Sequence, residues 1–347
     1  MIFNKRYQKK TKRVSGFSLT EILIGLVISS MLMTTLLYIM VDLMTSSQND
    51  QARNATNEEM KQSLDYIAQE LREATYVYTG EELEESRTIG NTTLQPVKKF
   101  LPDFGANTRP ILAFWKVESV PYSGSNATLP SSCTGFTGTK VAECNTLRIE
   151  QRTYTLVVYV QSTNNTNNDW NGGSRIHRYQ LRKYSNPTNL TQETGYIDPM
   201  LNSTFQQWPY NLKLKSAQIS LPTTSNSNYI PLTDFVASPT FANSTITTQD
   251  DFNCPTVQNN DQFLYKPSPY GVPPTGTNTD YKPTNAKSFF ACVRDASVTT
   301  NQGFNQDVLL FVRGNAKGKP GVDKDEMLGM LQVQAISRGV IRKTVAE

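Results

Sequence analysis

The sequence has few of the residues on which most enzyme sites depend. Its 347 residues include a single histidine, His177, and four cysteines, none of which forms a Cys-x-x-Cys pair. It also has no glycine-rich loop of the kind that cradles phosphates. A serine or cysteine nucleophile needs a positioned base, and a zinc site needs clustered Cys and His ligands. The sequence therefore predicts no enzyme, no cofactor and no zinc site.

The N-terminal leader has no acidic residue, and residues 22–41 have no charged residue of either sign. Six Lys and Arg residues precede Glu21, which is the first acidic residue, and residues 22–41 are uncharged. A helix of this length crosses a hydrocarbon core of roughly 30 Å. Positive charge on one flank keeps that flank cytoplasmic. We therefore expect a single-pass inner-membrane protein with a cytoplasmic N-terminus and a periplasmic head.

A cleavable secretory signal and a plain uncleaved anchor share this general plan. The apolar run is longer than the usual signal core of roughly 7–15 residues, and no Ala-x-Ala site follows it. An ionised carboxylate near the entrance of a membrane helix costs about 2–3 kcal/mol or more. Glu21 is therefore expected to have a cationic partner, from another chain or from a new N-terminus.

The sequence GFSLTE at residues 16–21, after a short basic leader, resembles the class III signal of type IV pilins and pseudopilins. The resemblance implies that a prepilin peptidase cuts between Gly16 and Phe17 and methylates the new N-terminal Phe17. It also implies that Glu21 neutralises the terminal amine of a neighbouring subunit during filament assembly. One departure is that many major pilins carry a proline in this helix, whereas the first proline here is Pro96. How the helix would loosen in a filament is therefore left open.

The large cysteine-containing head resembles the PilW-like group of minor pilins. The segment DVLLFVRGNAKG and the Asn/Thr-rich body look most similar to the cyanobacterial hormogonium polysaccharide secretion pseudopilins. The resemblance implies a non-enzymatic subunit that primes or caps a filament, supports motility and polysaccharide export, and reaches the pilus or cell surface. The implied partners are the prepilin peptidase, other pilins or pseudopilins, an inner-membrane assembly platform, membrane lipid before assembly, and the exported polysaccharide.

Two other functional classes fit parts of the sequence. A type II secretion pseudopilin would share the whole N-terminal pattern, and a membrane-anchored lectin-like receptor would use the helix only as an anchor. Trp170 and Trp208 are candidates for stacking on sugar rings, although core positions are the simpler interpretation. Nucleic acid is not an expected partner, because removal of the leader changes the formal net charge from +4 to 4 − 6 = −2.

The four cysteines lie outside the apolar run, at Cys133, Cys144, Cys254 and Cys292. On the exported side of a membrane an even number predicts two disulfides. The sequential pairing is the simplest of the three arrangements, but the sequence does not determine it. On the chain-entropy account, closing a loop of about a dozen residues stabilises the fold by roughly 3 kcal/mol.

A long helix is predicted to continue beyond the apolar run. Residues 42–59 are polar but contain neither proline nor glycine, and apolar residues then recur at three- and four-residue steps. This stripe comprises Met60, Leu64, Ile67, Ala68, Leu71 and Ala74. Gly80 is the expected stop. Two separate helices joined by a polar linker are the alternative.

The remainder predicts an α+β, pilin-like fold in which the helix packs on an antiparallel sheet. Strands are expected at residues 111–117, 146–152, 153–161, 176–184, 212–221, 288–294, 307–313 and 327–341. The expected organisation is a leader at 1–16, a membrane or filament-core helix at 17–41, an amphipathic continuation at 42–80, and a head at 81–347 with an irregular, disulfide-stapled insertion at about 222–283. Asp323, Asp325 and Glu326 are weak calcium candidates, because their spacing does not complete a calcium loop. A solvated turn is the better interpretation.

Overall fold

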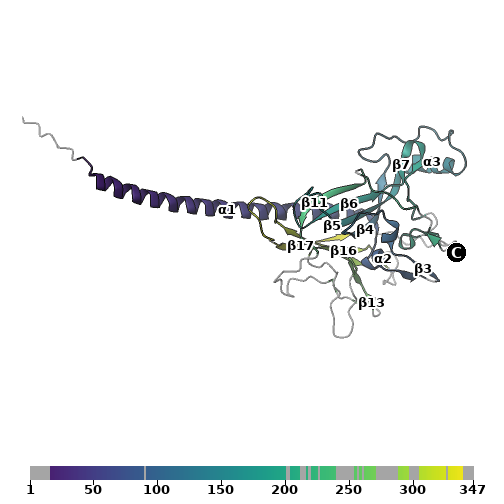
Figure 1. Ribbon diagram of the computed structural model, residues 1–347. Coiled ribbons are helices and arrows are strands. Elements are labelled where there is room, and N and C mark those ends of the chain that lie inside the picture. The colour runs from purple at the N-terminus through teal and green to yellow at the C-terminus, as the bar shows by residue number, and fades with distance from the viewer. Residues whose placement is uncertain are drawn as a thin grey trace, which may run out of the picture. The chain divides into compact units, whose positions relative to one another are not determined.

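The structure is a computed structural model of the chain. It describes residues 16–89, 91–200, 204–211, 216–217, 220–225, 227–239, 254–255, 258–259, 262–270, 288–296, 305–325 and 327–338. The chain divides into two compact units, one ending at Asp50 and the other beginning at Gln51. The predicted α+β, pilin-like architecture is confirmed: a long N-terminal helix packs with a curled antiparallel sheet (Figure 1).

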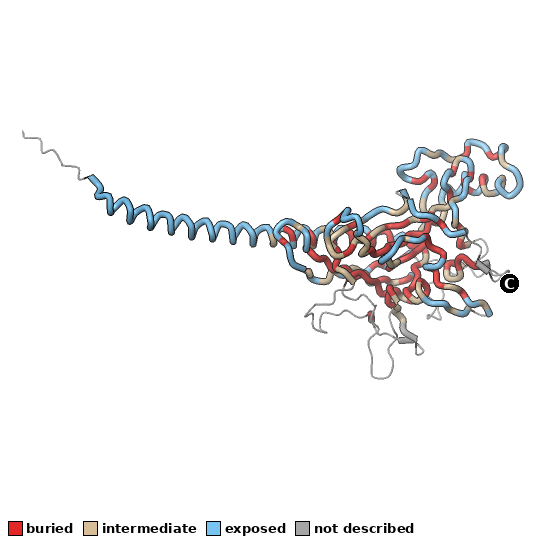
Figure 2. Tube along the Cα trace, viewed as in Figure 1, coloured by how far each residue is buried: buried red, intermediate tan, exposed pale blue. Residues whose placement is uncertain are grey.

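The N-terminal helix α1 (Leu19–Arg72) is continuous, so the two-helix alternative is wrong. Figure 2 shows it exposed over its first part, and its buried residues begin at Ala52. From there to Leu71 the buried positions follow three- and four-residue steps, as the sequence predicts. The helix ends at Arg72 instead of near residue 80, because Ala74–Val77 form strand β1 and pair with β4.

The main sheet has the strand order β1-β4-β5-β6-β11-β16-β15-β14, and β17 pairs with β16. Every pairing in it is antiparallel. Its strands are β1 (Ala74–Val77), β4 (Thr108–Ser119), β5 (Arg152–Ser162), β6 (Ser174–Leu181), β11 (Tyr229–Val236), β14 (Tyr265–Ser268), β15 (Phe289–Arg294), β16 (Asp307–Asn315) and β17 (Met327–Ile336).

Short elements cover the rest of the head. They are α2 (Gly80–Glu84), β2 (Arg87–Ile89), β3 (Thr92–Leu94), η1 (Val97–Phe100), α3 (Thr139–Glu150), β7 (Tyr184–Asn186), η2 (Pro187–Asn189), β8 (Thr191–Gln192), η3 (Phe205–Gln207), β9 (Tyr210–Asn211), β10 (Ser216–Ala217), β12 (Gln258–Asn259) and β13 (Gln262–Phe263). Thr79 caps α2 through a reciprocal capping box with Glu82.

The sheet separates two cores. On one face, Met60, Ile67 and Leu71 of α1 pack against residues of β4, β5 and β16. On the other face, Trp115 and Trp208 belong to an aromatic-rich cluster. Full burial of one such side chain contributes about 1.5–3 kcal/mol, so the C-terminal part of α1 is held mainly by its apolar stripe.

Three sequence predictions need correction. Residues 146–152, predicted as a strand, lie largely in α3, where Cys144 and Leu147 are buried one turn apart. The predicted insertion at 222–283 contains β11, which pairs with β6 and β16 in the middle of the sheet, as well as β14. Of the predicted strand at 212–221, residues 216–217 form β10, which pairs with β9. Residues 220–221 are not in a strand, and the others lie outside the described residues.

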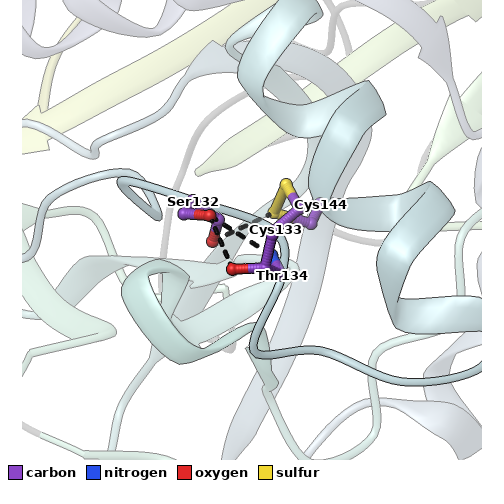
Figure 3. Close-up of a disulfide and its surroundings, with 4 residues drawn as sticks. All are labelled: Ser132, Cys133, Thr134 and Cys144. Carbon is purple, nitrogen blue, oxygen red and sulfur yellow. Dashed lines mark hydrogen bonds between the residues drawn. A yellow bond between two sulfur atoms is a disulfide. The ribbon is translucent and has the colours of Figure 1, made fainter.

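The structure contains two disulfides, in the sequential pairing. Cys133–Cys144 ties the loop before α3 to the helix itself, close to the hydroxyls of Ser132 and Thr134 (Figure 3). It belongs to a small cluster separate from the two main cores. Cys254–Cys292 attaches a loop to β15 and is buried beside Phe290.

Candidate functional site

The predicted cleavage point lies just before α1. Gly16, Phe17 and Ser18 are not helical, and the helix begins at Leu19. No atom lies within 4 Å of a Cβ built on Gly16. The Phe17 side chain is 76% exposed. The Gly16–Phe17 peptide bond therefore lies outside the helix between two exposed residues, as a peptidase would require of its substrate.

Ser18 and Glu21 together form the start of the helix. The Ser18 carbonyl accepts hydrogen bonds from the Glu21 N–H at 3.0 Å and from the Ile22 N–H at 3.2 Å. The Glu21 carboxylate accepts from the Ser18 N–H at 3.4 Å. This is one arm of a capping box, and the pattern Ser-x-x-Glu is the sequence signal by which it could have been found. Within the described residues, no cation contacts the Glu21 carboxylate.

The serine and threonine hydroxyls of the apolar segment are satisfied within the helix. Ser29, Ser30, Thr34 and Thr35 each donate to a carbonyl three or four residues earlier, at 2.7–3.1 Å. Such bonds remove the cost of placing a hydroxyl donor away from water. The four polar residues are therefore compatible with a lipid or filament environment.

Apolar side chains cover this segment and remain exposed. The large side chains from Leu19 to Met44 are about half to four-fifths exposed. By length and composition, α1 is long and apolar enough to cross a membrane, and none of its most apolar window is buried. An uninterrupted apolar surface of this extent needs lipid or protein to cover it.

A second carboxylate, Glu70, lies near the other end of α1 in the opposite environment. Arg178 of β6 donates to both of its oxygens at 2.8 Å. Lys116 of β4 pairs with it at 2.8 Å, and the Tyr159 hydroxyl of β5 donates to it at 2.5 Å. The sequence analysis missed this cluster, because its members are brought together only when α1 docks on three strands.

Electrostatics favour the ionised form of Glu70. Burial by itself raises its pKa, but hydrogen bonding and charge from Arg178, with smaller contributions from Lys116 and Tyr159, outweigh burial and lower the pKa from 4.5 to about 2. The pKa of the Tyr159 hydroxyl is raised by burial and by the neighbouring Glu70 charge. The cluster is therefore a buried ion pair with its hydrogen bonds satisfied, and it fastens α1 to the sheet.

Of the three calcium candidates, Asp323 and Asp325 lie within the described residues. Asp325 accepts hydrogen bonds from the Asn315 amide at 2.9 Å and from the Lys317 ammonium at 3.1 Å. Glu326 lies outside the described residues. Among the residues that the structure describes, no group of three or more His, Cys, Asp or Glu side chains could hold a metal.

The lone histidine and two candidate stacking tryptophans occupy packed positions. His177 stacks on Tyr229 with ring centroids 4.5 Å apart. Burial and the neighbouring Arg175 lower its pKa to about 4, so it is neutral at physiological pH. Trp170 and Trp208 are both buried. Neither indole presents an open face for a sugar ring.

The comparisons with known proteins bear on the N-terminal segment. A family model described as the prokaryotic N-terminal methylation motif matches residues 11–37. A search of curated proteins and a search of solved structures each found no significant match. Type IV pilins, which carry this motif, are structural subunits processed by prepilin peptidase and assembled with other pilins. The motif and the exposed apolar helix that follows it support a type IV pilin-like protein whose N-terminal helix fits a single-pass inner-membrane anchor.

Proposed function

We propose that the chain is a minor pilin or pseudopilin subunit of a type IV pilus-like assembly. The observation that carries this proposal is the order of features along one short segment. An exposed, non-helical Gly16–Phe17 bond is followed by Glu21 in the first helical turn and then by twenty uncharged residues. A plain anchor needs only the last of these features.

The position of Glu21 suggests how a subunit joins its neighbour. Cleavage after Gly16 would create an α-amine on Phe17, a cation of the kind that a carboxylate in lipid needs. In the separate subunit the Glu21 carboxylate contacts only the Ser18 N–H, at 3.4 Å, among the described residues. A longer hydrogen bond of this kind is easily exchanged for a stronger one. We propose that assembly replaces it with the amine of an adjoining subunit.

The head supports a priming or capping role. It begins at Gln51, contains the nine-stranded sheet, and carries a disulfide-bonded projection around α3. Closely spaced copies along a fibre would have to accommodate such heads side by side, whereas one copy at the end of a fibre would not. This favours a subunit present in few copies.

A role in motility and polysaccharide secretion is part of the proposal and rests on the resemblance of the 307–318 segment and the Asn/Thr-rich body. Deletion of the gene tests it. Loss of surface filaments and motility, or of secreted polysaccharide, would support this role. Periplasmic accumulation of secreted enzymes, with motility and polysaccharide intact, would instead identify a type II secretion pseudopilin.

Mass spectrometry of the mature N-terminus is the direct test of processing. We expect protein purified from its native envelope to begin at a methylated Phe17. Gly16→Ala should retain the leader, while Gly25→Ala, which changes a glycine inside the helix, should be processed normally. A wild-type protein that still begins at Met1 would rule out the proposed function.

The Glu21→Ala variant separates a filament subunit from a simple anchor. A simple anchor should insert as well or better without the carboxylate, because its burial in lipid is costly. A filament subunit should be cleaved but should fail to enter sheared surface filaments. Normal incorporation of Glu21→Ala into filaments would contradict the assembly role of Glu21.

A further inference from the structure

The main sheet has strands with one unpaired edge, and these edges differ in whether other parts of the head cover them. Among the described strands, β1, β14 and β17 pair along one side only. An unpaired strand edge presents a row of N–H and C=O groups to which another strand can bond, and proteins usually block it. The question is therefore which of these three edges is blocked.

Two of the edges are blocked by the head itself. The side chain of Gln306 accepts from the Val77 N–H at 2.7 Å and donates to the Val77 carbonyl at 2.8 Å, which closes the edge of β1. The start of α2 lies against β14, where a Cβ on Gly80 would be only 2.1 Å from the Pro267 carbonyl oxygen. Neither edge can accept a further strand without displacing these contacts.

The edge of β17 is different, and its register identifies the groups that face outward. The Ser337 N–H donates to the Gln306 carbonyl of the neighbouring segment at 2.9 Å. Hydrogen-bonding direction alternates along a regular strand, so from Met330 onward odd-numbered residues of β17 face β16 and even-numbered residues face away. The bond from the Arg338 N–H to the Ala74 carbonyl, at 3.1 Å, agrees with this parity and marks where the open edge ends.

The outward groups of β17 from Met330 to Ile336 carry no protective charge or proline. They belong to Met330, Gln332, Gln334 and Ile336, for whose backbone no partner exists among the described residues. No charged residue and no proline occurs from Met327 to Ile336. Natural edges are blunted by Lys, Pro or bulges. The β16–β17 pairing has one register shift, between Met327 and Met330, and it is regular from Met330 to Ile336. This regular, uncharged part of the edge is a template for strand addition.

We infer that the edge of β17 is completed by an extended segment supplied by a different protein chain. The main-chain groups require an extended backbone, and only a polypeptide offers matching donors and acceptors at this spacing. The side chains of β17 beside this edge indicate which residue types the partner strand should carry. Leu331 and Val333 are half-buried at the margin of the α1 core. Gln332 and Gln334 are exposed on the other face.

A partner strand should therefore place apolar residues on the face of Leu331 and Val333. It should place uncharged polar residues on the face of Gln332 and Gln334. A charged residue toward the α1 core would be left without a counter-ion, so an alternating apolar and polar segment is the preferred sequence.

A second copy of this chain fits the edge poorly. β17 runs parallel to the C-terminal part of α1, because Leu328 lies with Thr56 and Met60 around Gly314 while Arg338 bonds to Ala74. Antiparallel pairing of two β17 strands would set the two helices in opposite directions. Two subunits drawn from one membrane enter an assembly in the same direction, which disfavours this pairing and favours a strand from another chain. This inference rests on the proposed function.

Hydrogen–deuterium exchange of the full chain tests the inference. Amides of Met330, Gln332, Gln334 and Ile336 are compared between protein purified in detergent micelles and protein in isolated native envelopes and sheared filaments. We expect exchange in the native setting to be slower by about tenfold or more. Equal exchange in the two settings would overturn the inference, even where Phe17 is the mature N-terminus and the proposed function holds.

A pair of variants sharpens the test. Gln332→Pro removes an outward N–H but no bond to β16, and proline is tolerated at such edge positions. Gln332→Ala is the matched control, because it keeps that N–H. We expect both variants to fold, as judged by tryptophan fluorescence and both disulfides, and only Gln332→Pro to lose the native protection at Gln334 and Ile336. Retained protection in a folded Gln332→Pro variant would contradict the inference. If that variant does not fold, the inference is judged by wild-type amide exchange alone, compared between detergent micelles and the native envelopes and filaments.

Two other occupants would be recognised in the same experiment. Protection that is already present in purified monomer and disappears on truncation after Arg338 would identify residues 339–347 of the same chain. Protection that appears in purified protein together with a concentration-dependent dimer would identify a second copy. Either result would overturn the assignment to a different chain.

Discussion

The two ends of α1 place a carboxylate in opposite surroundings. Glu21 lies in an exposed apolar segment and accepts one long hydrogen bond from its own chain. Glu70 is buried and is held by Arg178, Lys116 and Tyr159. One charge is already neutralised when the head folds, whereas the other, on the proposed function, is left for a later partner. On that proposal, one helix stabilises the head at one end and binds a neighbouring subunit at the other.

The largest expected effect comes from removing the paired carboxylate. Glu70→Ala leaves Arg178 and Lys116 near the core without an anion, and breaking a buried pair in this way costs about 3–5 kcal/mol. Urea unfolding of the full chain in micelles, followed by fluorescence of its buried tryptophans, measures this loss. The control is Glu73→Ala, which removes a half-exposed second partner of Lys116 and should cost less than about 1 kcal/mol. Equal costs for the two variants would contradict the account.

Acid should weaken the head through the same residue. Because the folded-state pKa of Glu70 is lowered to about 2, its contribution is complete at neutral pH and is lost as pH falls from about 4.5 towards about 2. The loss amounts to at most about 3 kcal/mol. Unfolding midpoints measured across this range should fall for the wild type more steeply than for Glu70→Gln. Parallel pH profiles for the two proteins would show that Glu70 is not the responsible group.

Two glycines allow the same comparison between the two parts of α1 to be made for side-chain packing. A Cβ on Gly314 would lie 2.8 Å from Thr56 and 3.0 Å from Met60, where the sheet meets α1. Gly314→Ala should therefore cost about 1–3 kcal/mol. Among the described residues, nothing beyond its own stretch of helix lies within 4 Å of a Cβ on Gly25. Gly25→Ala should leave the urea midpoint unchanged, and a loss as large as that of Gly314→Ala would contradict this difference in packing between the two glycines.

The smallest effect on stability is expected at the other carboxylate. Glu21→Gln keeps an oxygen that can accept from the Ser18 N–H, so the free energy of unfolding should change by less than about 0.5 kcal/mol. Incorporation into sheared filaments should nevertheless be lost, because the amide cannot neutralise an amine. A variant that both folds and assembles normally would remove the distinction between the two ends of the helix.

Much of the fold could be predicted from local patterns. The strands near residues 111–117, 153–161, 307–313 and 327–341 were found by their β-branched and apolar content, and the stripe from Met60 to Leu71 by its helical period. The prediction failed at 146–152, where Thr, Leu and Ile suggested a strand. There the Cys133–Cys144 bond and the burial of Leu147 favour α3 over local strand propensity.

The C-terminal end of α1 is a second place where the local sequence pattern does not predict the structure. The apolar period continues from Leu71 to Ala74, so sequence predicts helix beyond Arg72. Pairing of β1 with β4, together with the Gln306 side chain on Val77, gives these residues more hydrogen bonds and burial than another helical turn would. The residue that supplies this preference is 229 positions away from Val77.

The sequence by itself determined the N-terminal segment: the basic leader, Gly16 and Phe17, the Glu21 carboxylate and the apolar run. These features are contiguous, so covalent spacing along one helix is enough to relate them. Only the tertiary structure decided the partners of Glu70, the route of β11 through the sheet and the open edge of β17. Those outcomes depend on residues that are distant along the chain, such as Glu70 and Arg178 with their separation of 108, which meet only when the sheet has closed around α1.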